Sequence, residues 1–324
     1  MASTTHELPE RADFARLTAP YRRELVALCY RMLGSAEDAE DVVQETYLNA
    51  WRAFDSFQGR ASLRTWLYRI ATRACLKALE GGVRRPLPSG LAGPGEIPDG
   101  PMPRQPEIAW LRPIPDDPAE TVESRQSMRL AFVAALQHLP PRQRAVLILR
   151  DVLSWRTAEV AELIGTTDAA VTSALQRARA QLRRVSPRED TLMEPSEAQQ
   201  RELLDGYAMA FQNADVDTLT RLLAEDAVWE MPPIPVWFAG ADRIARFLAG
   251  RVLVSGPGHF RLLPTTANGQ PAFGLYTRDA GGVHRPHGLQ VLSLAPTGIT
   301  RVVTFHDAGL PAAFALPAVV SAAG

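Results

Sequence analysis

The sequence predicts a multidomain protein with two all-α parts followed by an α+β part, and three observations support this prediction. The chain has 324 residues, which is more than one ordinary hydrophobic core organises. A proline-rich stretch separates two segments with helical periodicity. From about residue 196 the pattern changes to helices followed by short alternating runs, which are typical of strands. We therefore expect four parts, at residues 11–82, 83–120, 121–186 and 196–310.

Composition limits the class of protein. The longest apolar runs are much shorter than the roughly 20 residues that cross a bilayer, so we expect no membrane segment and a cytoplasmic location. Cys29 and Cys75 lie inside helical patterns, which favours small buried residues over a disulfide or a metal pair. Residues 121–190 carry eleven arginines and seven carboxylates, a net charge of +4, so nucleic acid is the first partner to test there. We expect no metal and no cofactor.

An acidic helix follows the first predicted helix. Residues 11–33 carry apolar side chains at helical spacing, and Gly34 ends that segment. In the next segment, 36–57, an acidic side opposes an apolar one, and Asp38, Asp41 and Glu45 fall at i, i+3 and i+7 on the acidic side. A solvated surface and a dock for a basic protein both explain this pattern. A metal site is disfavoured because no His or Cys joins the carboxylates.

The third predicted helix combines aromatic and basic residues. It buries a stripe that includes Leu63 and Leu67, and polar or aromatic side chains lie beside this stripe and in the loop before it. These candidate residues are Arg60, Ser62, Trp66, Arg69 and Arg73. Aromatic faces stack on unpaired bases while arginines hold phosphates, so the set suits separated nucleic-acid strands. The alternative is that Trp66 and Tyr68 are core aromatics.

Ten prolines between residues 83 and 118 exclude both a helix and a central strand. We expect an extended linker, which in a polyproline-like conformation would span roughly 100 Å at about 3.1 Å per residue. It contains one apolar island, at 109–117. Trp110 and Leu111 in this island either dock on a neighbouring domain or contact a partner.

Residues 156–184 predict a helix-turn-helix. Helices are expected at 156–164 and 169–184, with a turn at Gly165, where the lack of a Cβ permits a left-handed backbone. The second helix carries small polar residues and arginines that suit base edges, guanine and phosphate in the major groove. They are Thr172, Ser173, Gln176, Arg177, Arg179 and Arg183. A purely structural helical hairpin is the alternative.

The C-terminal part contains aromatic and histidine side chains that suit a small-molecule pocket. The candidates are Trp229, Trp237, Tyr276, His287 and His306. The alternative is that the aromatic residues form the core. His306 and Asp307 are neighbours at a strand end and point apart, which makes a poor acid–base pair. Because no catalytic set assembles, we predict that the protein is not an enzyme.

Three stretches of sequence resemble a known family. The run DAEDVVQETYLNAWRAFDSFQGRASLRTWLYRIATRACL is similar to region 2 of bacterial extracytoplasmic-function sigma factors, and LPPRQRAVLILRDVLSWRTAEVAELIGTTDAAVTSALQRARAQL is similar to their region 4. The segments EDAVWEMPP, WFAGADRIARFL and NGQPAFGLY resemble the SnoaL-like (NTF2-like) extension of the SigG-type subgroup. The resemblance implies a region 2 helical bundle, a region 4 helix-turn-helix and a cone-shaped α+β domain.

The resemblance also implies partners and roles. The helix with Asp38, Asp41 and Glu45 would meet the β′ clamp of core RNA polymerase, and the β flap would be a second contact. The loop 57–62 and the helix with Trp66 would open the −10 promoter element and hold it as a single strand. The helix 169–184 would read the −35 element. We expect the C-terminal domain to modulate activity and to hold a small-molecule ligand.

Two alternatives remain open at this stage. One is a ligand-responsive helix-turn-helix regulator that acts without core polymerase. The other is isomerase or cyclase activity in the C-terminal domain.

Overall fold

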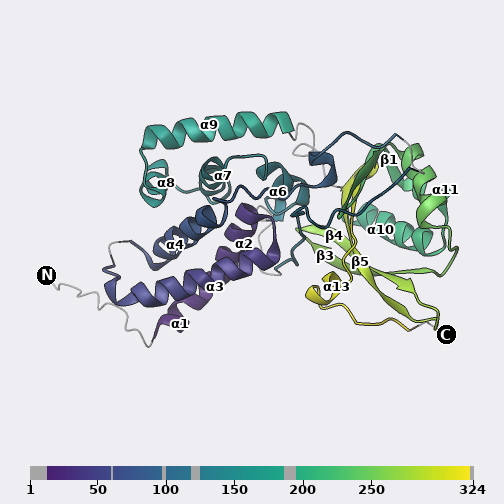
Figure 1. Ribbon diagram of the computed structural model, residues 1–324, viewed down its shortest axis with the longest axis horizontal. Coiled ribbons are helices and arrows are strands. Elements are labelled where there is room, and N and C mark those ends of the chain that lie inside the picture. Colours follow the sequence, from purple (N-terminus) through teal and green to yellow (C-terminus); the bar gives the residue numbers. More distant parts are fainter. Residues whose placement is uncertain (1–12, 60, 97–99, 118–124, 186–194, 322–324) are drawn as a thin grey trace. The chain divides into compact units, whose positions relative to one another are not determined.

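The computed structural model describes residues 13–59, 61–96, 100–117, 125–185 and 195–321 (Figure 1). It separates into two compact units. The first contains residues 1–85 and 130–187, and the second contains residues 86–129 and 188–324. The two helical segments that the sequence predicts therefore belong to one unit, and the proline-rich stretch belongs to the other. Each unit is described separately below.

The N-terminal half of the first unit is a helical bundle. Its helices are α1 (Phe14–Thr18), α2 (Arg22–Leu33), α3 (Ala36–Ala53) and α4 (Leu63–Ala78), and the 3-10 turns η2 (Ala19–Tyr21) and η3 (Phe54–Ser56) lie between them. Gly34 ends α2 with φ 73°, and Ser35 then caps α3 by accepting a hydrogen bond from the Asp38 amide. Leu25, Leu28 and Leu67 are fully buried between α2, α3 and α4.

The other half of the first unit holds the helix-turn-helix. Its elements are α6 (Leu130–Leu136), α7 (Pro141–Leu147), the π-helical turn η5 (Ile148–Val152), α8 (Thr157–Ile164) and α9 (Asp168–Val185). Gly165, with φ 69°, closes α8 as predicted. The Thr167 hydroxyl accepts a hydrogen bond from the Ala170 amide at 3.2 Å, which satisfies an amide at the start of α9.

A buried arginine joins the two halves of the first unit. Arg144 of α7 is 2 % exposed, and its guanidinium donates to the Met32 carbonyl in the last turn of α2. It also donates to the side chain of Gln137 at 2.8 Å and to the Leu139 carbonyl at 3.2 Å. Burial lowers the pKa of Arg144 to about 10, so it stays a cation at neutral pH. A cation near a helix C-terminus also complements the helix dipole.

The second unit is an α+β domain, which confirms the predicted fold class. Its helices are α10 (Glu197–Gln212), α11 (Val216–Leu222), α12 (Ala241–Phe247) with the π-helical turn η7 (Leu248–Val252), and α13 (Leu310–Ala313). Its strands are β1 (Leu223–Met231), β2 (Ile234–Ala239), β3 (Phe260–Ala267), β4 (Gln270–Arg278), β5 (His284–Ala295) and β6 (Gly298–Phe305). They form one mixed sheet in the order β2-β1-β6-β5-β4-β3, in which β1 and β6 run parallel and the other neighbours run antiparallel.

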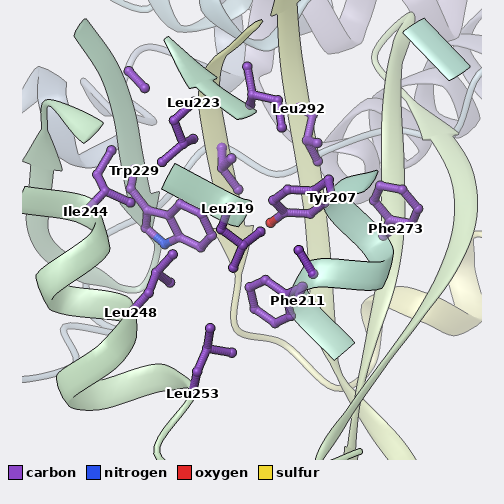
Figure 2. Packing of buried hydrophobic residues seen from close by; sticks show 14 of the residues in the cluster. Tyr207, Phe211, Leu219, Leu223, Trp229, Ile244, Leu248, Leu253, Phe273 and Leu292 are labelled. Atoms are coloured by element: carbon purple, nitrogen blue, oxygen red, sulfur yellow. The ribbon is translucent and has the colours of Figure 1, made fainter. Parts of the chain in front are cut away.

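Aromatic side chains fill the space between the helices and this sheet. Tyr207 and Phe211 of α10 pack with Trp229 of β1 and Phe273 of β4, and Figure 2 shows them together with Leu219 of α11. The rings of Phe211 and Trp229 are stacked with their centroids 6.4 Å apart. Trp229 is therefore mostly a core residue, which agrees with the alternative interpretation of the C-terminal aromatic residues.

Strand β2 is the strand that the sequence pattern misses. Its sequence, IPVWFA, contains Pro235 and shows no clear alternation of apolar and polar residues. Proline is tolerated in a sheet at an edge, and β2 is the edge strand beside β1. The prediction fails here because a position at the sheet edge depends on the other strands and leaves no local signal.

The proline-rich stretch, expected to be an extended linker over 83–120, is hydrogen-bonded along the second unit. We call residues 86–96 and 100–117 the strap. The Gly95 amide donates to the Trp237 carbonyl at 2.7 Å, and the Gln105 amide donates to the Pro233 carbonyl at 2.8 Å. Further along, the Ile114 amide donates to the Asn268 side chain at 3.0 Å. The extended backbone thus finds its hydrogen-bond partners on β2 and on the turn between β3 and β4.

The apolar island of the strap explains why this stretch contains hydrophobic residues. Trp110, Leu111 and Ile114 are buried, with exposed fractions of 8 %, 0 % and 8 %. The indole of Trp110 donates to the Gln105 carbonyl at 2.8 Å. The island thus supplies buried side chains, and the strap that carries it is hydrogen-bonded to the second unit at Ile114.

Candidate functional site

The acidic side of α3 is an exposed face with an apolar residue in it. Asp41 and Glu45 are exposed, and Leu48, which lies on the same side, has an exposed fraction of 57 %. A large apolar side chain surrounded by carboxylates is typical of a protein-docking surface. Leu48 was missed by sequence reasoning, although an apolar residue on the polar side of an amphipathic helix was the available signal.

Asp38 differs from the two other acidic candidates. It lies in the first turn of α3 and forms an ion pair with Arg85. The exposed acidic face therefore centres on Asp41, Glu45 and Leu48, and Asp38 lies at its edge with a charge that Arg85 already balances.

Trp66 belongs to an aromatic cluster at the start of α4. Its ring centroid lies 5.0 Å from that of Phe57 and 6.3 Å from that of Phe54, and the residue is half-buried. Ser62 caps α4 by accepting a hydrogen bond from the Thr65 amide at 3.1 Å. Arg60 lies outside the described residues. Trp66 thus takes part in the core while one side of it stays accessible.

Tyr68 is a core residue, which agrees with the alternative interpretation of the aromatic residues in this helix. It is fully buried, and its hydroxyl donates to Glu24 at 2.9 Å. Burial, followed by the nearby Glu24 charge, raises the pKa of Tyr68. Its ring packs against Trp155 from the other half of the unit, with centroids 5.2 Å apart.

The arginines of α4 have different surroundings. Arg73 is exposed. Arg69 is 27 % exposed and forms an ion pair with Glu162 of α8 at 2.5 Å. The basic side of α4 is consequently divided between a solvent-facing arginine and one that faces the helix-turn-helix.

Helix α9 presents a polar stripe to solvent. Thr172, Gln176, Arg179 and Arg183 are exposed and lie at i, i+4, i+7 and i+11, which is one side of a helix. The adjacent side of the helix is buried through Val171, Leu175 and Ala178. Figure 1 shows α9 as a long straight helix at one edge of its unit.

The flanking candidates on α9 are held by local contacts. The Arg177 guanidinium donates to the Ser173 hydroxyl at 2.5 Å. Arg179 makes a bidentate pair with Asp151 of η5, at 2.8 and 2.6 Å, and this hydrogen bonding raises the pKa of Arg179. Asp151 thus orients Arg179 across the turn, a role that sequence reasoning missed because the two residues are 28 positions apart.

The second unit contains a cavity of about 280 Å³ between α10, η7 and the sheet. Phe211, Trp229 and Leu275 contribute apolar walls, and His287 and His306 lie at a polar end. Two expected lining residues lie elsewhere. Trp237, on the edge strand β2, donates its indole hydrogen to the Ala92 carbonyl of the strap at 2.9 Å. Tyr276 follows the lining residue Leu275 along β4, so its side chain leaves the opposite face and donates to the Pro317 carbonyl at 2.7 Å.

His287 and His306 form a hydrogen-bonded pair, Nε2 to Nδ1, at 3.0 Å. Burial, followed by the charges of His287 and Arg104, lowers the pKa of His306 to about 3. Burial likewise lowers the pKa of His287, so both rings are neutral at neutral pH. Asp307 turns away and pairs with Arg112 of the strap at 2.7 Å, as the sequence predicted for neighbours on a strand.

Within the described ranges, no group of three or more His, Cys, Asp or Glu side chains is placed to hold a metal ion. No described helix is long and apolar enough to cross a membrane.

Three family models match the chain in order. They are Sigma-70 region 2 over residues 17–85, Sigma-70 region 4 over residues 129–182, and the SnoaL-like domain over residues 204–308. The first match contains α2–α4, the second contains α6–α8 and most of α9, and the third contains the sheet and its cavity.

Similar proteins include two curated sigma factors. The chain is 52 % identical to the ECF RNA polymerase sigma factor SigG of Mycobacterium tuberculosis, over 95 % of this chain and 85 % of that one. It is 29 % identical to the ECF RNA polymerase sigma factor SigJ of the same organism, over 86 % and 85 % of the two chains. The crystal structure of M. tuberculosis SigJ matches with a TM-score of 0.63 at 24 % identity, covering 95 % of this chain and 100 % of that one, which supports the fold.

Proposed function

This chain belongs to the extracytoplasmic-function family of RNA polymerase sigma factors, and we propose that α4 and α9 divide the reading of the promoter between them. Sigma factors bind core RNA polymerase and promoter DNA, and they direct the initiation of transcription. The observation that carries the proposal is the exposed stripe of α9, which places a glutamine and two arginines on the second helix of a helix-turn-helix.

In this proposal, α9 enters the major groove at the −35 element. Gln176 can bond an adenine edge through both ends of its amide, and arginines bond guanine or phosphate. Thr172 and Ser173, nearer the start of the helix, reach base edges. Arg177, Arg179 and Arg183, nearer its end, reach the backbone.

Helix α4 and the turn before it are proposed to hold the opened −10 element. Trp66 is half-buried and packs against Phe57 at a tilt of 42°, and the accessible part of its indole suits stacking on an unpaired base. Arg73 supplies a cation for the phosphates, and Ser62 offers a hydroxyl beside the turn. Arg60 belongs to the same proposal. Arg69 joins this surface once it is released from Glu162.

The exposed face of α3 is proposed to dock on the β′ clamp of core polymerase. Asp41 and Glu45 supply negative charge, Leu48 supplies the apolar contact, and Asp38 contributes at the edge. We propose that the half of the first unit that contains α6–α9 contacts the β flap of core polymerase.

The second unit is proposed to be regulatory and to hold a small molecule, without catalytic activity. The docked strap lies in the chain between the two halves of the first unit, one with α4 and the other with α9. If part of the strap left the second unit, a longer stretch of free chain would join these two halves. The neutral histidine pair and the diverging Asp307 favour binding over acid–base catalysis.

Footprinting with and without core polymerase tests this function. We expect protection of both promoter elements only when core polymerase is present. Tight protection of a palindromic site by the protein alone would instead indicate a regulator that acts independently of polymerase. Turnover of a small molecule that is lost in His287 or His306 variants would indicate an enzyme.

A further inference from the structure

We propose that the cavity of the second unit binds an uncharged, largely apolar molecule of about two fused rings, which carries one hydroxyl or carbonyl group that bonds to the His287–His306 pair. This inference rests on the proposed ligand-holding role of the second unit and specifies the chemical class of the ligand.

The size of the cavity sets the size of the ligand. Its volume is about 280 Å³. A dry protein cavity of about 150 Å³ accommodates one benzene ring. The cavity here is roughly twice as large, which suits two fused rings or an aliphatic molecule of similar volume.

The walls favour an apolar body. Phe211, Trp229, Met231, Phe260 and Leu275 line the cavity, and each is less than a tenth exposed. The rings of Phe211 and Trp229 are parallel to each other, with their centroids 6.4 Å apart. Burying apolar surface against them contributes about 25 cal/mol for each Å² removed from water.

The polar end favours a single neutral polar group. A neutral imidazole has one donor and one acceptor nitrogen. When two such rings share one hydrogen bond, the two remaining nitrogens comprise one donor and one acceptor, whichever tautomer is present. The two remaining nitrogens point away from each other, so one polar group bonds to one of them: a hydroxyl to either nitrogen, and a carbonyl to the donor. Nearby, the two ends of the Gln290 side chain are already bonded to Tyr207 at 2.9 Å and to Thr304 at 3.3 Å.

The charges disfavour an ionic ligand. Among the lining residues in the described part of the chain, there is no Asp or Glu to pair with a cation. Arg251 lies at the exposed rim and donates to the Gly100 carbonyl of the strap at 2.7 Å, so its charge is in the solvent rather than at the histidine pair. Arg104 of the strap lies outside the lining residues and donates to the His306 carbonyl at 2.7 Å. A carboxylate that reached the neutral pair would therefore lose its hydration without gaining a direct ion pair with a lining side chain.

Three probes of equal ring size test the proposal: 2-naphthol, naphthalene and 2-naphthoate. Their binding to the full chain at pH 7 is measured by titration calorimetry. We expect saturable one-to-one binding of 2-naphthol. Naphthalene and 2-naphthoate should bind about tenfold more weakly, the former through loss of the hydrogen bond to the pair and the latter through desolvation of its charge.

Two variants locate the binding. His287→Leu should bring the affinities of 2-naphthol and naphthalene within about twofold of each other. Val254→Trp, at a rim position that is 65 % exposed, should weaken both probes by obstructing the entrance without disturbing the core. His138→Gln, in the first unit, is the matched histidine control and should bind like the wild type.

The outcomes are distinct. Tightest binding of 2-naphthoate would overturn the uncharged class while leaving a ligand role for the second unit. An unchanged probe preference in His287→Leu would overturn the assignment of the polar end. No binding of any probe would contradict both the ligand class and the ligand role. Run-off transcription by the same preparations reports separately on promoter activity.

Discussion

Helices α4 and α9 both have arginines on a proposed DNA-binding surface, but the two helices differ in how exposed their candidate residues are. The polar stripe of α9 is exposed, and its buried side rests on α7 and α8. Helix α4 is packed on several sides, with Trp66 in an aromatic cluster and Arg69 paired to Glu162 of α8. A helix that reads a duplex must have its side chains exposed before it meets the DNA. Residues that hold a melted strand can also pack in the core, and they become accessible when a neighbouring group moves away.

Removal of Arg144 should have the largest effect, because this residue holds the α9 half of the unit onto α2. Arg144→Met leaves the Met32 and Leu139 carbonyls buried without their donor. We expect a loss of about 3 kcal/mol in the free energy of unfolding of the first unit, measured by urea denaturation. Arg142→Met, at an exposed position of the same helix, should cost less than about 0.5 kcal/mol. Equal losses in the two variants would contradict the role of Arg144.

Substitution of Trp66 tests α4 directly. Trp66→Ala should weaken promoter opening by about tenfold or more, since stacking contributes about 1–3 kcal/mol per base. Permanganate footprinting of the −10 element measures this, and closed-complex formation should be unchanged. Trp51→Ala, a 39 % exposed tryptophan of α3, is the control and should open promoters normally. Normal opening by Trp66→Ala would make Trp66 a packing residue only.

Two substitutions separate base reading from phosphate contact on α9. Gln176→Ala should change the base preferred at one position of the −35 element, at a cost of about 1–3 kcal/mol. Arg183→Ala should weaken binding to all sequences alike and reduce its salt dependence. Transcription from a library of −35 sequences at two salt concentrations measures both effects. A uniform loss in Gln176→Ala would contradict direct base reading.

The smallest effect is expected at the ion pair between Arg69 of α4 and Glu162 of α8. Glu162 is 72 % exposed, so its pair with Arg69 contributes only about 0.2–1 kcal/mol. Glu162→Gln should release Arg69 and raise the affinity for single-stranded −10 DNA up to about fivefold at low salt. Fluorescence anisotropy measures this, with Glu159→Gln as the control. Reduced affinity would show that Arg69 needs Glu162 for its position.

The sequence predicted those features that depend on neighbouring residues. Gly165 and Thr167 act within one turn of their own helices, so the helix-turn-helix and its polar stripe could be located. The docked strap could not, because the partners of its backbone lie on Trp237, Pro233 and Asn268, more than a hundred residues away.

The candidate site residues show the same difference between features that depend on neighbouring residues and features that depend on distant ones. Asp38 looked equivalent to Asp41 and Glu45 until the structure paired it with Arg85. Tyr276 looked like a pocket residue, but the direction of a side chain on β4 depends on strand register, which the pattern alone leaves open by one residue. The histidine pair joins residues on two adjacent strands, β5 and the end of β6, and composition alone carried no sign of their contact.

Run-off transcription with purified core RNA polymerase tests the central claim most directly. The full chain is added to core enzyme on a promoter of the family type, and Trp66→Ala and Gln176→Ala are compared with it. We predict a transcript that depends on the added chain. Trp66→Ala should reduce it by about tenfold or more at every promoter, and a changed −35 base should restore it for Gln176→Ala. No transcript from the wild-type chain, together with no stable complex with core polymerase, would contradict the account.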